Sequence, residues 1–107
     1  MEIKQYQIFL VNLDPTLGSE IQKTRLCVVV STNEMNKYLQ TIVVCPMTIN
    51  LREYPTRVAA TTDNKKGMII IDQIRTIDKS RIINFFGNLN NTEIRNCKRV
   101  IKQTFVD

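Results

Sequence analysis

The apolar residues of the chain come in short runs of strand length as far as about position 90, and turn-forming residues separate the runs. Leu26–Ser31 is typical, because it contains three consecutive valines and β-branched residues pack well on a pleated sheet. Runs of this length and composition indicate buried strands. We predict six strands, at Gln7–Leu13, Leu26–Ser31, Thr41–Met47, Arg57–Thr61, Met68–Ile71 and Arg81–Phe86.

Three local signals refine this pattern. Pro46 has no backbone N–H to donate, so we expect the end of the third strand to lie at a sheet edge or at a bulge. Asn33 to Leu39 is expected to form a short turn or a single helical turn, with Asn33 as its N-cap. Phe85 and Phe86 are expected to be core residues on opposite faces of a strand, unless one of them faces a dimer partner.

After position 89 the apolar pattern changes to a helical period. Asn90 and Glu93 match a capping box at the start of this segment. Short strands followed by one helix predict a mainly β fold, a mostly antiparallel small barrel or sandwich with a C-terminal α-helix. The apolar stripe of the helix is expected at Ile94, Cys97, Ile101 and Phe105.

A length of 107 residues and a hydrophobic content of 43% suit a single domain, residues 1–107, with one compact core. The longest apolar runs are far shorter than the roughly 18 residues that a membrane span needs. The N-terminal segment is charged and polar from its second residue, without the apolar stretch and cleavage site of a signal peptide. We therefore expect a cytoplasmic protein with no membrane partner.

The net charge is +5, from 15 Lys and Arg against 10 Asp and Glu. A basic small domain suggests a polyanionic partner, nucleic acid first, although such charge also serves solubility alone. Histidine is absent, which removes the usual acid–base residue and the commonest zinc ligand. The cysteines are odd in number and widely spaced, so we expect buried free thiols, no disulfide framework, no metal site and no cofactor. They are Cys27, Cys45 and Cys97.

A polar loop separates the first two predicted strands, and a hydroxyl residue, Thr48, follows the third. Loops carried by a rigid sheet are where binding and chemistry concentrate. The loop can equally be an ordinary solvated hairpin connection. Its candidate functional residues are Ser19, Glu20, Lys23, Thr24 and Arg25.

Three segments of the chain resemble the MazF/PemK toxin family, in the family's order and at its length: DPTLGSEIQKTR followed by CVVVS, then CPMT, then DQIRTIDKSRI. The resemblance implies a small SH3-like barrel of the CcdB/PemK type and a ribosome-independent endoribonuclease that cleaves single-stranded RNA. It also implies a homodimer and a MazE-like antitoxin whose disordered tail covers the RNA groove. The family's catalytic arginine and hydroxyl residue correspond here to Arg25 and Thr48.

The chain departs from the family pattern at three places. Leu26 stands where the family usually has proline after the arginine, and Lys4–Gln5 stands where a Gly-Asp or Gly-Glu pair is usual. Ile70 stands where a PemK-like branch has a functional arginine, so that branch's version of the active site is not supported.

RNA supplies its own nucleophile, the 2′-hydroxyl, so its cleavage needs neither a metal nor a protein nucleophile. Arg25 suits stabilisation of negative charge on the phosphate oxygens, because a guanidinium donates two parallel hydrogen bonds. Glu20 either accepts the 2′-hydroxyl proton or orients Arg25 through an ion pair, and the sequence leaves both roles open. Thr48 either binds a phosphate oxygen or is simply a strand-end residue. The expected products carry 2′,3′-cyclic phosphate and 5′-hydroxyl ends.

Other residues are candidates for holding the RNA through phosphate contacts, base contacts or stacking. Ser19 can instead simply form a turn, and the segment around Tyr54 can be an exposed flexible loop. Arg75 is a further possible phosphate contact, but it can equally belong to an internal polar network with Thr76, Asp78 and Arg81. The RNA-binding candidates are Ser19, Lys23, Thr24, Asp72, Gln73, Tyr54 and Arg57.

Two other functions fit a basic barrel of this kind. A gyrase poison like CcdB relies on a C-terminal Trp-Gly-Ile, whereas this chain ends Thr104-Phe105-Val106-Asp107 and contains no tryptophan. A non-catalytic barrel that binds single-stranded nucleic acid would show salt-sensitive binding without strand scission.

Overall fold

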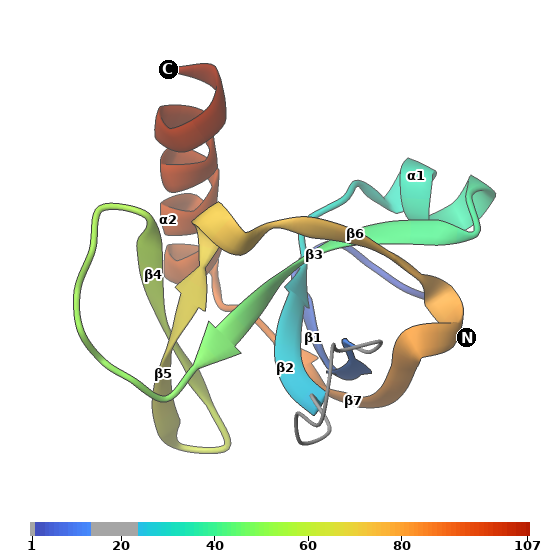
Figure 1. Ribbon diagram of the computed structural model, residues 1–107, viewed down its shortest axis with the longest axis horizontal. Coiled ribbons are helices and arrows are strands. Elements are labelled where there is room, and N and C mark those ends of the chain that lie inside the picture. The colour runs from blue at the N-terminus through green and yellow to red at the C-terminus, as the bar shows by residue number, and fades with distance from the viewer. Residues whose placement is uncertain (1, 14–23) are drawn as a thin grey trace, which may run out of the picture.

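The structure is a computed structural model, and it describes residues 2–13 and 24–107 (Figure 1). No helix in these ranges is long and apolar enough to span a membrane. The strands are β1 (Gln7–Asn12), β2 (Thr24–Val29), β3 (Thr41–Thr48), β4 (Arg57–Thr62), β5 (Lys65–Ile70), β6 (Arg75–Asp78) and β7 (Ile82–Asn88). The helices are α1 (Asn33–Tyr38), α2 (Asn91–Ile101), two short 3-10 helices, η1 (Ile71–Gln73) and η2 (Lys79–Arg81), and a π-helical end, η3 (Lys102–Val106).

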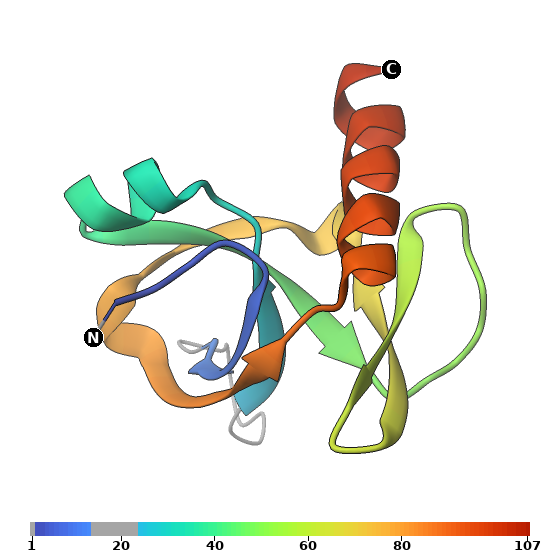
Figure 2. The ribbon, with the colours of Figure 1, turned by 180° about the vertical axis from the view of Figure 1, so that it is seen from behind.

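The described strands form one curled antiparallel sheet in the order β4-β5-β3-β2-β1-β7, and β6 pairs with β3. Figures 1 and 2 show the sheet curving into a half-barrel, with α2 beside the β4–β5 hairpin. The predicted mainly β fold with a C-terminal helix is confirmed.

Strand β3 is the centre of the sheet because it changes neighbours along its length. On one side it pairs with β6 through Thr41–Val44 and then with β5 through Met47–Thr48. On its other side Pro46 lies opposite Cys27 of β2. The expectation that Pro46 marks a sheet edge is therefore wrong. The proline falls between the two stretches of pairing on the first side, where its missing N–H interrupts neither ladder.

The central strands β2 and β3 are buried on both faces over much of their length, which explains why they appear as nearly continuous apolar runs. In β2, Cys27 and Val29 belong to one apolar cluster and Val28 belongs to the other. In β3, Val44 belongs to the cluster of Cys27 and Val29, and Cys45 belongs to the cluster of Val28. One cluster fills the space between the sheet, α2 and the β4–β5 hairpin, and the other lies on the opposite face.

The predicted capping box at the start of α2 is confirmed. The Glu93 backbone N–H donates to the Asn90 side-chain oxygen at 2.8 Å, and the Asn90 N–H donates to the Glu93 carboxylate at 2.9 Å. The second carboxylate oxygen of Glu93 accepts the backbone N–H of Thr61 in β4 at 2.9 Å. Together with the buried Cys97 and Val100, this bond holds α2 against the sheet.

Two local predictions need correction. The N-cap of α1 is Thr32, whose hydroxyl accepts the N–H of Met35, whereas the Asn33 side chain accepts the N–H of Gln5 at 2.7 Å. Strand β6 was not predicted, because its single buried residue, Ile77, leaves no apolar run; its pairing with β3 makes it a strand.

Three aromatic residues lie nearer the surface than their patterns predict. Phe85 is 53% exposed and Phe86 is 39% exposed, because β7 pairs only with β1 and forms an edge of the described sheet. Phe105 is 51% exposed. Beyond Ile101 the helix widens to a π-helix, in which the Asp107 N–H donates to the Lys102 carbonyl oxygen. Because a π-helix has more residues per turn than an α-helix, Phe105 is rotated away from the apolar stripe.

Candidate active site

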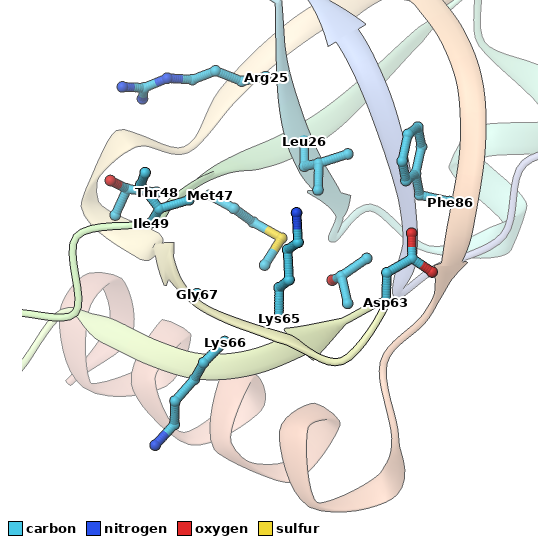
Figure 3. A pocket seen from close by; sticks show the side chains of 11 residues that line it. Arg25, Leu26, Met47, Thr48, Ile49, Asp63, Lys65, Lys66, Gly67 and Phe86 are labelled. Carbon is cyan, nitrogen blue, oxygen red and sulfur yellow. The ribbon is translucent and has the colours of Figure 1, made fainter.

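The sheet brings Arg25 and Thr48 together from opposite ends of neighbouring strands. Strands β2 and β3 pair at Val29–Val44, Val28–Cys45 and Cys27–Pro46. If this register is continued two residues beyond its last pair, Arg25 of β2 falls level with Thr48 of β3, and both residues line the same pocket. Since side chains alternate along a strand, these two residues share one face of the sheet. Figure 3 shows the two side chains extending in the same direction.

The ladder between β2 and β3 stops at Cys27–Pro46 because β3 then pairs with β5, while β2 continues along β1. A pocket of about 460 Å³ opens where the two strands separate (Figure 3). Leu26 and Met47 give it apolar walls, and Lys65 points into it. It is lined by Arg25, Leu26, Met47, Thr48, Ile49, Thr62, Asp63, Lys65, Lys66, Gly67 and Phe86.

Two contacts fix the position of Thr48. Its hydroxyl oxygen accepts the backbone N–H of Asn50 at 3.2 Å, which leaves the hydroxyl hydrogen for another acceptor. Across the ladder, Gly67 lies so near β3 that a Cβ there would sit 3.1 Å from the Thr48 carbonyl oxygen. Glycine at this position therefore lets β5 hold the end of β3 closely.

Arg75 lies on the same face as this pair. It is exposed and stands opposite Val44 of β3, and Val44 and Thr48 are an even number of residues apart. Burial raises the pKa of the Cys27 thiol to about 12, while the positive charges of Arg25 and Arg75 partly oppose that rise. Both guanidinium groups are thus near Cys27. In the sequence, Arg75 could contact phosphate or belong to an internal polar network, and the absence of a strand pattern in β6 gave no position that would decide between them.

Two other members of the predicted internal network, Asp78 and Arg81, make hydrogen bonds to the protein backbone. The Asp78 carboxylate accepts the N–H of Ser80 at 2.8 Å, and these hydrogen bonds with Ser80 lower the pKa of Asp78. Arg81 donates to the backbone carbonyl of Asn12 at 3.3 Å. Both contacts are structural: that of Asp78 is local, and that of Arg81 ties η2 to the end of β1.

A second polar cluster lies at the other end of the β4–β5 hairpin. The Thr56 hydroxyl donates to the Asp72 carboxylate at 2.7 Å, and the Arg57 guanidinium lies 4.6 Å from the centre of the Tyr54 ring. Arg52 donates to the Tyr54 hydroxyl at 3.1 Å. None of these residues lines the pocket beside Arg25 and Thr48.

The other residues predicted from the sequence to bind RNA do not gather at one place in the described structure. Gln73 is exposed in η1, next to Asp72. Thr24 is exposed at the start of β2, next to Arg25 and opposite Asn12. Ser19, Glu20 and Lys23 lie outside the described residues.

The three cysteines are free, and each is fully buried. Burial raises the pKa of each thiol to about 12, so all three are neutral at physiological pH and unsuited to nucleophilic attack. Over residues 2–13 and 24–107, no group of three or more His, Cys, Asp or Glu side chains is placed to hold a metal ion.

Comparison with known proteins identifies the family of this chain. Residues 4–105 match the model of the PemK-like, MazF-like toxin of type II toxin–antitoxin systems. The chain is 34% identical over 86 residues to a Staphylococcus epidermidis protein named Endoribonuclease MazF, covering 75% of this chain and 72% of that relative.

Solved structures share the fold. A MazE–MazF crystal structure from Deinococcus radiodurans superposes with a TM-score of 0.83 at 19% identity, over 96% of this chain and 95% of that one. A mycobacterial endoribonuclease in complex with its cognate antitoxin superposes with a TM-score of 0.80 at 20% identity, over 94% and 92% of the two chains. The chain therefore belongs to the PemK-like, MazF-like family of type II toxin–antitoxin toxins.

Proposed function

We propose that this protein is a toxin endoribonuclease that cleaves single-stranded RNA, including mRNA, at specific sequences. The observation that carries the proposal is the shared face and matching register of Arg25 and Thr48 beside an open pocket. The name of its curated relative, Endoribonuclease MazF, supports the same activity.

The proposed reaction is a transesterification at one phosphate. The 2′-oxygen forms a bond to phosphorus while the bond from phosphorus to the 5′-oxygen breaks. One proton leaves the 2′-hydroxyl and one is delivered to the 5′-oxygen, which gives 2′,3′-cyclic phosphate and 5′-hydroxyl ends. Arg25 stabilises the extra negative charge on the phosphate oxygens, and the free hydroxyl hydrogen of Thr48 donates to one of them.

Glu20 is proposed to complete the site in one of two roles, as proton acceptor or as a carboxylate that orients Arg25. Glu20→Gln separates them. Loss of a proton acceptor removes the acidic limb of the pH–rate profile, whereas loss of an orienting group lowers kcat and leaves the profile's shape. Arg75, on the same face, is proposed to supply further positive charge that binds the phosphate backbone of the RNA. Arg75→Gln should therefore raise KM more than it lowers kcat.

RNA on either side of the cleaved phosphate is proposed to contact the loop residues Ser19, Lys23 and Thr24. The second cluster is proposed to bind bases or phosphates further along the strand. Its exposed Tyr54 ring offers a stacking surface, since aromatic faces bind unpaired bases. The residues of this second RNA contact are Asp72, Gln73, Tyr54 and Arg57.

The proposed partners are a MazE-like antitoxin, whose disordered tail covers the RNA groove, and a second copy of the chain. The solved relatives that contain MazE or a cognate antitoxin support the first. The exposed apolar side chains of β7 support the second. The proposed compartment is the cytoplasm, where mRNA substrates are found.

The test is incubation of the purified chain with long single-stranded RNA in EDTA. We expect cleavage at a recurring motif, with 5′-hydroxyl ends that accept phosphate from polynucleotide kinase without prior dephosphorylation. A strict magnesium requirement would contradict the proposed chemistry. Salt-sensitive binding without scission would identify a non-catalytic nucleic-acid-binding barrel instead.

A further inference from the structure

The outward face of α2, continued by the first residue of η3, carries four cations that the proposed reaction does not use. Residues three, four and seven positions apart share one face of a helix, and all four cations are exposed. We call this set the basic stripe. It consists of Arg95, Lys98, Arg99 and Lys102.

The positive charge of the basic stripe is not neutralised by its own helix. Glu93, the acidic residue of α2, is buried and accepts hydrogen bonds from backbone N–H groups. Arg95 donates to the Thr92 hydroxyl at 3.2 Å and Arg99 donates to the Asn96 side-chain oxygen at 3.4 Å, and both acceptors are neutral. Because a guanidinium has five N–H donors, each arginine keeps several for a ligand.

The stripe is presented on a firmly held element. Cys97 and Val100 bury the inner face of α2, and the capping box fixes its first turn. Figures 1 and 2 show α2 standing beside the β4–β5 hairpin, with its C-terminal end extending beyond the sheet.

The dimensions of the stripe suit a polyanionic strand. From Arg95 to Lys102 the helix rises by about 10 Å, at about 1.5 Å per residue. A stacked nucleic-acid strand carries one phosphate per roughly 3.4 Å of axis, so the stripe spans about three phosphates. Phe105 follows Lys102 by three residues, and its exposed ring offers a surface on which an unpaired base can stack.

We propose that the basic stripe is a second RNA-docking surface, which binds the backbone of substrate RNA outside the cleaved motif. This inference rests on the proposed endoribonuclease function. The helix dipole also favours cations in the last turns of α2, but that effect concerns stability and gives no dependence on RNA length.

The test compares two substrates that share one cleaved motif, an RNA of several hundred nucleotides and an oligonucleotide limited to the motif itself, which has no flanking nucleotides to contact the stripe. The stripe variant is Arg95→Gln/Arg99→Gln/Lys102→Gln. We expect its KM for the long RNA to rise about tenfold, and the log–log salt dependence of binding to lose a slope of about 2 for three lost phosphate contacts. Its kcat/KM for the oligonucleotide should stay within about twofold of the unmodified chain.

The matched control is Lys4→Gln/Lys37→Gln/Lys79→Gln, whose residues line a separate pocket beside α1. Both variants lower the net charge from +5 by 3, to +2, so a general charge effect moves them equally. Equal KM values for the two variants on long RNA would overturn the inference. The inference would also be overturned if the stripe variant kept its KM for RNA but lost binding to an acidic protein, because the stripe would then be a protein-binding surface. Failure of the unmodified chain to cleave either substrate would instead reject the proposed function.

Discussion

At the scale of single residues, the candidate site depends on two polar, accessible side chains that β2 and β3 present on one face of the sheet. Thr48 is held by a hydrogen bond from Asn50 on one side and by close packing against Gly67 on the other. Arg25 is exposed at the start of β2, where the ladder to β3 has ended. A phosphate can therefore approach both groups from the same face of the sheet.

The buried thiols predict how stability changes with pH. The pKa of Cys27, Cys45 and Cys97 is about 12 in the folded chain, against an ordinary value of 9.0. Between these values the unfolded chain loses thiol protons that the folded chain keeps, so the free energy of unfolding should fall as pH rises above about 9. The limiting slope is about 1.4 kcal/mol per pH unit for each thiol.

Urea denaturation at pH 8, 9 and 10 measures this slope. Cys97→Ala should reduce it by one thiol's share, and the three thiols should make no difference below pH 8. A slope unchanged by Cys97→Ala would show that other groups cause the alkaline loss.

At the scale of elements, the change of neighbours along β3 makes the site. The strand leaves β6 and joins β5 near Pro46, and the separation from β2 opens the pocket beside Arg25 and Thr48. The position of the β4–β5 hairpin relative to β3 therefore sets the position of the Thr48 hydroxyl.

Gly67→Ala tests this dependence. The added Cβ would lie 3.1 Å from the Thr48 carbonyl oxygen, so β3 and β5 must move apart by a few tenths of an ångström. We expect kcat to fall about tenfold, because small misplacements of catalytic groups are costly. The matched control is Val100→Ala in α2, which destabilises the core by about 1.5 kcal/mol away from the site and should leave kcat within about twofold. Equal kcat in the two variants would show that β5 does not position Thr48.

The elements whose residues carry a local signal were predictable from the sequence. The capping box at Asn90 and the apolar runs of β1, β2 and β3 identified their elements to within a few residues. Strand β6 and the exposure of Phe105 depend on pairing with β3 and on the π-helical ending, which no local pattern encodes.

The candidate site was predictable only in part. Their places in the chain made Arg25 and Thr48 candidates, and the family resemblance made them a catalytic pair, but their shared face follows from the register between β2 and β3. The place of Arg75 beside them follows from the pairing of β6 with β3. The separation of Tyr54 and Asp72 from the pocket is likewise a property of the assembled sheet.

At the scale of the whole molecule, the apolar side chains that remain exposed on β7 suggest association of two copies. Ile83, Phe85 and Phe86 are 45%, 53% and 39% exposed on an edge strand of the described sheet. Edge strands with exposed apolar side chains are surfaces that proteins normally cover.

We expect a homodimer of two 12.4 kDa chains at micromolar concentration, and Phe85→Lys should shift it towards the monomer. Tyr38→Lys on α1 is the control, because Tyr38 is an aromatic residue that is 71% exposed elsewhere on the molecule. Analytical ultracentrifugation of the three proteins gives the masses, and thermal melting checks that each is folded. A monomeric unmodified chain would contradict the proposal.

The proposed activity depends most on Arg25 and Thr48 acting on the same phosphate. A double-mutant cycle tests this directly, with kcat/KM measured for the unmodified chain, Arg25→Ala, Thr48→Val and the double variant on one RNA oligonucleotide. Each single variant should lose about two to three orders of magnitude in rate. Because groups that act as a unit are not additive, the double variant should be only slightly slower than the worse single variant. Losses that multiply in full, or full activity in Arg25→Ala, would contradict the account.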